Sequence, residues 1–490
     1  SPPKRFQSTW DTTQEGSSNN QVVLPLQSAG AYSFQIDWGD GTSNRDTITA
    51  YDQAEVTHTY DSTGVYEIRI IGDITGWSFG GAGDDDKIMD ISQWGPLRLI
   101  GGAVFRGCSN LQLSTTDPLI LSNVTNMRQA FDGCNIGTAG NVGSWDVSTI
   151  ERVRSMFKNN SLFNQDLSNW NTTNLGSISD EGDGMFGECT VFNNGGSPGI
   201  SGWDVSNWTN SQGMNYMFYR CRAFNQPLDG WDVTGVVSMV QMFSSADDFN
   251  NGGSTGINNW RPSSCTNMSS MFAFSDFNQP INDWDVSKVT SMSSMFRGCP
   301  FNQPLSGWDV SSVTTMHNMF NYNAPFDQDI GSWNVTGVVG TPGSNNGFRG
   351  TFSTRFNNGG SPSISGWDVS NCRNMIAMFQ NNSYFNQPIG YWDTSSLESM
   401  YNMFDNADAF DQDLSNWNVS NVNSATNFMV NANGLSTANY DRTLSGWSSQ
   451  SVNNGVSIHF GGSQYSTATG AAYRATLVSK GWTITDGGAV

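Results

Sequence analysis

A block of about 25 residues is repeated along most of the chain. Residues 284–308 read WDVSKVTSMSSMFRGCPFNQPLSGW, and residues 308–333 read WDVSSVTTMHNMFNYNAPFDQDIGSW. The Trp that opens the block recurs mostly every 24 or 25 residues. A fixed period of this size is typical of solenoids, in which one repeat cannot bury its apolar face alone. We therefore predict a chain of stacked coils.

Each repeat predicts the same local structure. Trp308 and Val310 alternate with polar residues, which favours a short strand with one face inward. Ser311 is a suitable N-cap, and Met316 and Met319 follow at helical spacing. One coil is therefore predicted to be a strand, a short helix or 3₁₀ turn, and a returning loop.

Residues at equivalent repeat positions should form columns, because neighbouring coils stack about 4.8 Å apart. The column of Trp residues and the columns of Met, Met and Phe are the predicted core. The Asn or Asp that follows the next Phe is predicted to satisfy backbone groups of neighbouring coils. The indoles assigned to the core are Trp145, Trp170, Trp203, Trp231, Trp284, Trp308, Trp333, Trp367, Trp392 and Trp417.

The residue after each Trp should point to the outer face of the predicted strands, and it is usually Asp. One interpretation is a column of hydrogen-bonded structural carboxylates. The other interpretation is a surface whose carboxylates recognise a ligand or are bridged by Ca²⁺. The candidate binding residues of this Asp column are Asp146, Asp204, Asp232, Asp285, Asp309, Asp368 and Asp393.

The charge balance argues against polyanionic partners. The chain has 43 acidic and 22 basic residues, a formal net charge of −21. That balance disfavours nucleic acid and anionic membranes as partners. No apolar run approaches the roughly 20 residues of a membrane-spanning helix. The sequence starts at Ser1 rather than Met, which suggests a processed or partial chain.

Cysteine and histidine patterns give little support for catalysis. The seven Cys residues occur at repeat positions that favour small buried side chains, so we expect free thiols rather than disulfides or a zinc site. His58, His317 and His459 lie in unrelated contexts, and no nucleophile, phosphate-binding or metalloprotease motif occurs. We expect no enzymatic activity and no required cofactor. Ca²⁺ is the one cofactor considered, with the acidic triplet Asp84, Asp85 and Asp86 as its candidate ligands.

The two ends of the chain differ from the repeats. Residues 1–75 contain strand-like stretches separated by turn signals, which predicts a small β-sandwich. Residues 76–435 form the predicted solenoid. Residues 436–490 combine strand-like and helix-like segments and are expected to cap its last coil.

Two family resemblances accompany these patterns. Trp38-Gly39-Asp40-Gly41-Thr42, followed by His58-Thr59-Tyr60, resembles the PKD family of immunoglobulin-like extracellular modules. The W-D-V-S-x-V-x-x-M-x-x-M-F blocks and the stretch LIGGAVFRGCSNLQL resemble the leucine-rich repeats of BspA-like bacterial and phage surface proteins. The resemblance implies an elongated leucine-rich-repeat-like solenoid with an N-terminal immunoglobulin-like β-sandwich and a C-terminal cap.

These observations lead to a functional expectation with two alternatives. We expect a non-catalytic protein of an extracellular, cell or virion surface that mediates adhesion or ligand binding through the solenoid face. Its partner would be a protein or glycan on another surface. The first alternative is a structural part of an assembly, such as a virion decoration, fibre or surface-layer subunit, with neighbouring copies as partners. The second is a glycan-binding module, which requires exposed aromatic residues such as Tyr219, Tyr322, Tyr384 and Tyr391.

Overall fold

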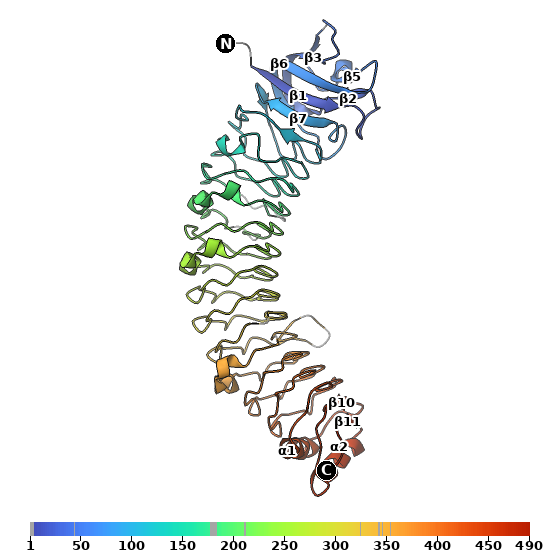
Figure 1. The fold of residues 1–490 in the computed structure, drawn as a ribbon, viewed down its shortest axis with the longest axis vertical. Helices are drawn as coiled ribbons and strands as arrows, with labels where there is room; N and C mark the ends of the chain where they lie inside the picture. The colour runs from blue at the N-terminus through green and yellow to red at the C-terminus, as the bar shows by residue number, and fades with distance from the viewer. Residues whose placement is uncertain are drawn as a thin grey trace. The chain divides into compact units, whose positions relative to one another are not determined.

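The computed structural model describes residues 4–43, 45–176, 184–209, 212–323, 325–341, 344, 346–352 and 354–490. The chain divides into two compact units. The first consists of residues 1–238 and 242–254, and the second of residues 239–241 and 255–490. Both units contain repeats, the first also carries the N-terminal β-sheets, and the second carries the C-terminal helices (Figure 1).

The N-terminal part of the first unit is built from two sheets. The larger has the strand order β4-β3-β6-β1-β7-β9, with β8 paired to β6, and the smaller pairs β2 with β5. Their bounds are β1 Arg5–Asp11, β2 Gln21–Val23, β3 Leu26–Asp37, β4 Asp46–Ile48, β5 Thr57–Thr59, β6 Val65–Trp77, β7 Ile88–Gln93, β8 Leu97–Arg98 and β9 Gln112–Leu113. A 3₁₀ turn, η1 (Ala54–Val56), precedes β5.

The larger sheet continues past the boundary expected at residue 75. Strand β6 crosses that position, and β7 pairs antiparallel with β1, where Thr9 faces Asp90. Strand β7 then pairs in parallel with β9, where Asp90 faces Gln112. The sheet therefore leads directly into the first repeats, without a linker between them.

Successive repeats are joined by backbone hydrogen bonds along the segment that contains the two Met residues and Phe. In the second unit, every other N–H of this segment donates to the next coil, and the N–H groups between them donate to the carbonyl three residues earlier in the same coil. The bonds to the next coil run from a main-chain N–H to a main-chain carbonyl. They join Met292 to Thr315 (3.1 Å), Ser294 to His317 (2.7 Å), Phe296 to Met319 (2.9 Å) and Gly298 to Asn321 (2.9 Å). Those within the coil run from Met295 to Met292 (3.2 Å), Arg297 to Ser294 (3.1 Å) and Cys299 to Phe296 (3.1 Å).

This pattern corrects the predicted local structure of the repeat. Two turns, at residues 311–312 and 317–320, flank the bridge residue Thr315 where a helix was predicted, and Trp308 and Val310 lie outside any strand. A helix would use its N–H groups internally, whereas here alternate groups must reach the next coil. Apolar residues three positions apart fit both three-residue turns and a helix. The sequence pattern therefore does not distinguish the two structures. The parallel bridges lie instead at Ser291, Thr315 and Gly347.

The ten indoles assigned to the core are all buried, as predicted, with exposures of 0–5%. Trp308 and Trp333 stack with ring centroids 6.4 Å apart. The sequence did not reveal that nine of these ten indoles also donate a hydrogen bond; Trp145 Nε1 has no partner among the described residues. Trp308 Nε1 donates to the carbonyl of Ile281 in the preceding coil at 2.9 Å. The same bond recurs at Trp170, Trp203, Trp231, Trp284, Trp333, Trp367, Trp392, Trp417 and Trp447.

The seven cysteines are buried and free, which confirms the expectation of thiols. Each occupies a repeat position beside the aromatic core. Cys299, for example, donates to the carbonyl of Phe277 at 3.0 Å. Burial raises the pKa of the Cys299 thiol to about 12, so it stays protonated and unreactive at neutral pH.

The polar column after the Phe residues forms the predicted ladder. In the second unit, the side-chain oxygen of Asn278 accepts from the N–H of Asn302 at 2.9 Å, and that of Asn302 accepts from Asp327 at 3.1 Å. The side-chain oxygen of Asp327 accepts from the N–H of Asn357 at 2.7 Å, and that of Asn357 accepts from the N–H of Asn386 at 3.0 Å. Each side chain therefore satisfies a backbone donor of the next coil.

The sequence FNNGG occurs at residues 192–196, 249–253 and 356–360, as an insertion before the Trp of its repeat, and the three copies share one conformation. Each forms a short 3₁₀ turn whose first Asn is buried at positive φ, and a second turn follows it. The turns are η3 Asn194–Gly196, η4 Pro198–Gly202, η5 Asn251–Gly253, η6 Thr255–Asn259, η7 Asn358–Gly360 and η8 Pro362–Gly366. A further 3₁₀ turn, η2 (Val142–Ser144), lies in an earlier coil.

The chain ends in a small α/β arrangement within the second unit. Helix α1 (Thr437–Ser448) begins at Ser436, whose hydroxyl accepts from Asn439 N–H, and it replaces the last repeat. Strand β10 (Ser457–His459) pairs in parallel with β11 (Thr483–Thr485), and helix α2 (Gly470–Ser479) connects them. None of the helices in the described part of the chain is long and apolar enough to cross a membrane.

Candidate functional site

The Asp column lies in turns on the surface rather than on a strand face. In each case one side-chain oxygen of the Asp accepts a hydrogen bond from the main-chain N–H of the residue two positions later. Asp309, for example, accepts from Ser311 N–H at 3.0 Å. Asn334 makes the same bond to Thr336 at 3.2 Å. These bonds close a turn within one coil, so they do not link neighbouring coils. The equivalent bond is made by Asp146, Asp204, Asp232, Asp285, Asp368 and Asp393.

The acidic triplet, which the sequence offered as a candidate calcium site, does not form one. Asp84 is buried and accepts from the N–H groups of Ser17 at 2.6 Å and Val23 at 2.7 Å. The buried ammonium of Lys87 lies 3.7 Å from Asp84 and donates to main-chain carbonyls, including that of Gln21 at 2.9 Å. A lysine therefore fills the position among carbonyl oxygens that a cation would occupy. Within the described ranges, no group of three His, Cys, Asp or Glu side chains could hold a metal ion.

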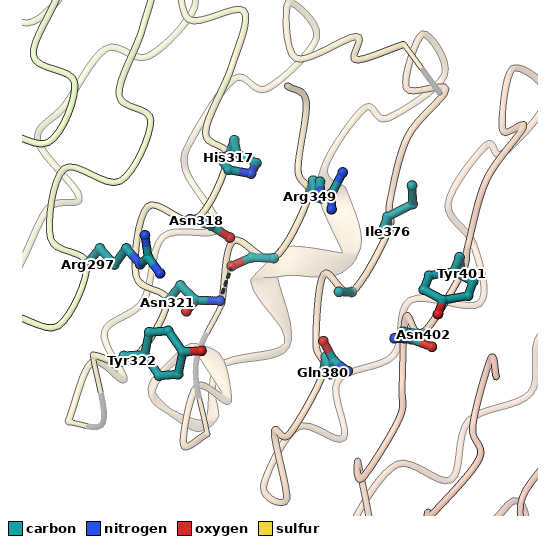
Figure 2. Close-up of a pocket in the computed structure, with 12 residues that line it drawn as sticks. Arg297, His317, Asn318, Asn321, Tyr322, Arg349, Ile376, Gln380, Tyr401 and Asn402 are labelled. Atoms are coloured by element: carbon teal, nitrogen blue, oxygen red, sulfur yellow. Dashed lines mark hydrogen bonds between the residues drawn. The ribbon is translucent and has the colours of Figure 1, made fainter. Parts of the chain in front are cut away.

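A polar hollow of about 490 Å³ lies on the second unit, over the turns that carry the Met and Phe residues. Its lining combines two arginines, one histidine, two tyrosines and several amides, and Figure 2 shows these side chains around it. Among the described residues that line it there is no carboxylate. The lining residues are Arg297, His317, Asn318, Asn321, Tyr322, Arg349, Gly350, Ile376, Ala377, Gln380, Tyr401 and Asn402.

The coil-to-coil hydrogen bonds fix the floor of this hollow. Asn318 N–H donates to the carbonyl of Arg349 at 2.9 Å, and Gly350 N–H donates to that of Ile376 at 2.9 Å. Ala377 N–H donates to the main-chain carbonyl of Tyr401 in the following coil at 2.8 Å. Asn321 Nδ2 also donates to the carbonyl of Gly350 at 3.3 Å, as the dashed line in Figure 2 marks. The lining side chains therefore project from a backbone that is already held in place.

The hollow is cationic at neutral pH because of its two arginines. Burial, and then the nearby guanidiniums of Arg349 and Arg297, lower the pKa of His317 below its usual value. His317 is therefore neutral near pH 7 and can donate and accept hydrogen bonds. The local positive charge contrasts with the net charge of −21 on the whole chain.

Sequence reasoning found only part of this site. Tyr322 was identified as lying off the core columns, and its side chain is 71% exposed. Tyr384 and Tyr391 are also exposed, whereas Tyr219 is half-buried beside Arg220. Arg297 and Arg349 were missed. Arg297 follows the core Phe column directly, whereas the hydrogen bond from Asn318 N–H to the carbonyl of Arg349 places Arg349 at the repeat position of His317. Reading one column of the repeats would therefore not have revealed both arginines.

Comparison with known proteins gives one family match. The family described as "Mycoplasma protein of unknown function, DUF285" matches residues 102–210, 181–255, 253–352 and 346–469. The matched segments follow one another along the repeats and include every residue that lines the hollow. No curated protein and no solved structure matches the chain.

Proposed function

The chain belongs to the DUF285 family, and from that premise we propose that it is a non-catalytic extracellular surface protein that mediates adhesion or ligand binding. The observation that carries this proposal is the hollow of the second unit, where exposed aromatic rings and two arginines surround a preformed polar surface. Convergent polar groups beside aromatic faces are typical of ligand sites.

The use of the repeat residues supports binding rather than catalysis. The Trp, Met and Phe side chains fill the core, and the Asn and Asp columns satisfy the backbone. What remains free to vary is the set of outward side chains on the turns. His317 in the hollow has no carboxylate partner among the described lining residues, so nothing orients it as a general base.

The proposal keeps the finer architecture suggested by the sequence. A BspA-like solenoid of the leucine-rich type, with a PKD-like domain before it, would carry the hollow at an extracellular, cell or virion surface. The coil-to-coil ladder of the second unit supports the first part of this assignment. The PKD-like domain is supported by the Tyr60 hydroxyl, which donates to the carbonyl of Trp38 at 2.9 Å and so joins the two motifs that carry the resemblance.

The test is binding of the full chain to intact cells and to immobilised extracellular proteins and glycans. We expect saturable binding, with the bound ligand recovered chemically unchanged. Tyr322→Ala should weaken binding, because it removes an exposed ring from the hollow. Tyr391→Ala removes a ring that is 81% exposed but lies outside the hollow, and it should leave binding intact. Absence of binding to every surface, or turnover of the ligand, would refute the proposal.

A further inference from the structure

Arg297 is held between two aromatic rings. Its Cζ atom lies 5.4 Å from the ring centroid of Phe274 and 5.5 Å from that of Tyr322. These rings come from the coils on either side, at the repeat position two residues after a core Phe. Cation–π contacts on both sides restrict the guanidinium to one orientation before any ligand arrives.

The intervening coil has Gly298 at the position of the two rings. Its φ is +66°, and a Cβ there would lie 2.5 Å from the ring of Phe274. A larger residue would therefore push Phe274 away from Arg297. The glycine keeps this aromatic clamp, formed by Phe274 and Tyr322 around Arg297, in place.

Polar groups in the hollow lack partners. The Nε atom of Arg297 is buried and has no hydrogen-bond partner among the described residues. Asn402 Oδ1, at the other end of the hollow, is buried and also lacks a donor within the described ranges. A buried polar group without a partner destabilises the folded state, because it has lost its hydrogen bonds to water. A ligand that offers an acceptor to Arg297 and a donor to Asn402 would relieve both.

We propose that the hollow binds an acidic sugar, with its carboxylate on the clamped guanidinium of Arg297 and with Arg349 adding positive charge to the same hollow. This inference rests on the proposed binding function and names its ligand class. Arginine matches a carboxylate with paired N–H donors. The amides of Asn318, Gln380 and Asn402 supply donors and acceptors for hydroxyl groups.

The surroundings favour a sugar over other anions. The exposed ring of Tyr322 and the partly exposed ring of Tyr401 offer flat apolar faces to the C–H face of a pyranose. A long polyanion such as nucleic acid would also meet the acidic surface that gives the chain its net charge of −21. The volume of about 490 Å³ lies within the roughly 300–1,000 Å³ of small-molecule sites.

The experiment measures affinity of the full chain for glycans that carry uronic or N-acetylneuraminic acid, each paired with its carboxyl-reduced form. A tetraglutamate peptide is the comparison for charge without a sugar. We expect binding of at least one acidic glycan, at least ten-fold weaker binding of its reduced form, and no comparable binding of the peptide. The reduced glycan tests the carboxylate without any change to the protein.

Variants then test the site. Arg297→Gln and Arg349→Gln should each weaken binding of the acidic glycan about ten-fold, while the melting curve stays unchanged. Arg222→Gln is the matched control, because its side chain is 66% exposed and lies in the first unit. Equal affinity for the acidic and reduced glycans, or equal binding by both hollow variants and wild type, would overturn the inference and leave the proposed function standing. Tighter binding of the peptide would overturn the sugar assignment, and no binding of any probe would count against both.

Discussion

At the residue scale, the indole N–H groups contribute more than ring volume. Trp308→Phe keeps an aromatic ring but removes the indole N–H that donates to the buried carbonyl of Ile281, which then keeps only the N–H of Trp284 as donor at 3.2 Å. We expect this lost hydrogen bond to lower the free energy of unfolding by about 0.5–1.5 kcal/mol, measured by urea denaturation. Trp308→Ala should cost about 3–5 kcal/mol, because it also empties the core.

Trp145 provides the control for the role of the hydrogen bond. Its ring is buried, but its Nε1 has no hydrogen-bond partner in the described part of the chain. Trp145→Phe should therefore cost clearly less than Trp308→Phe. Equal losses at the two positions would show that ring size, and not the hydrogen bond, sets the cost.

The Asp column predicts a component of acid sensitivity. Hydrogen bonds from the hydroxyl and N–H of the Ser two residues on lower the pKa of Asp309 and Asp368. A carboxyl with a lowered folded pKa stabilises the fold above its unfolded value near 3.9, and this contribution disappears as the pH falls through the folded pKa. The loss should therefore occur below about pH 4, and it should be small because both groups are exposed.

The double variant Asp309→Asn, Asp368→Asn tests this assignment. Asn keeps the accepting oxygen, as Asn334 does in its own coil, but it does not titrate. We expect urea midpoints close to wild type at pH 7 and a smaller decrease at pH 3. Asp52→Asn, Asp61→Asn gives the same change in charge at exposed residues outside the Asp column, and it should retain the wild-type decrease. Identical pH profiles for all three proteins would contradict the assignment.

His317 predicts that ligand affinity depends on pH. Its lowered pKa means that it is neutral at pH 7 and gains a proton only on acidification. The added charge would join those of Arg297 and Arg349, while a sugar carboxylate stays ionised at pH 5. Affinity for an acidic glycan should therefore rise as the pH is lowered from 7 and His317 gains its proton, measured by calorimetry. His317→Gln should abolish the rise, and an unchanged slope in that variant would refute the role of His317.

At the element scale, the FNNGG insertion is a packed unit rather than a loose loop. Asn358 Oδ1 accepts from the N–H of Ile330 at 2.9 Å, and its Nδ2 donates to the carbonyl of Ser361 at 2.8 Å. Its φ of 54° is a conformation that Asn tolerates better than most residues. Asn358→Ala should therefore cost about 2–4 kcal/mol and increase proteolysis within residues 356–366.

Asn381→Ala separates the backbone contribution from the hydrogen bonds. Asn381 has a φ of 62° but lies exposed on the surface. We expect its replacement to cost about 1 kcal/mol, from backbone strain and the loss of one exposed hydrogen bond from Asn406 Nδ2 at 2.8 Å. If the two substitutions cost the same, the buried hydrogen bonds of Asn358 would contribute nothing measurable.

The elements also show which features a repeat sequence can and cannot predict. The Trp column and the Asn ladder were predictable, because one role applies at every copy. The helix after Ser311 was predicted wrongly, because an apolar spacing of three fits both a helix and successive turns. The strand at Trp308 was also wrong, because the side chain of Asp309 closes a local turn.

At the scale of the whole molecule, features that depend on distant segments were not predictable. The Asp84 triplet has the composition of a cation site, but Lys87 takes the position of the cation among carbonyls contributed by residues 17–21. The hollow draws its lining from Arg297 to Asn402, across several coils whose outward side chains differ. We therefore propose that function in this chain lies at positions where the repeats diverge.

The most direct test of the account is a crystal structure of the full chain with the acidic glycan that binds most tightly. We predict that the glycan carboxylate lies within hydrogen-bond distance of Arg297, and that a sugar ring lies against Tyr322. A glycan bound along the Asp column of Asp285, Asp309 and Asp368, with the hollow empty, would contradict the central claim that the divergent outward positions form the binding site.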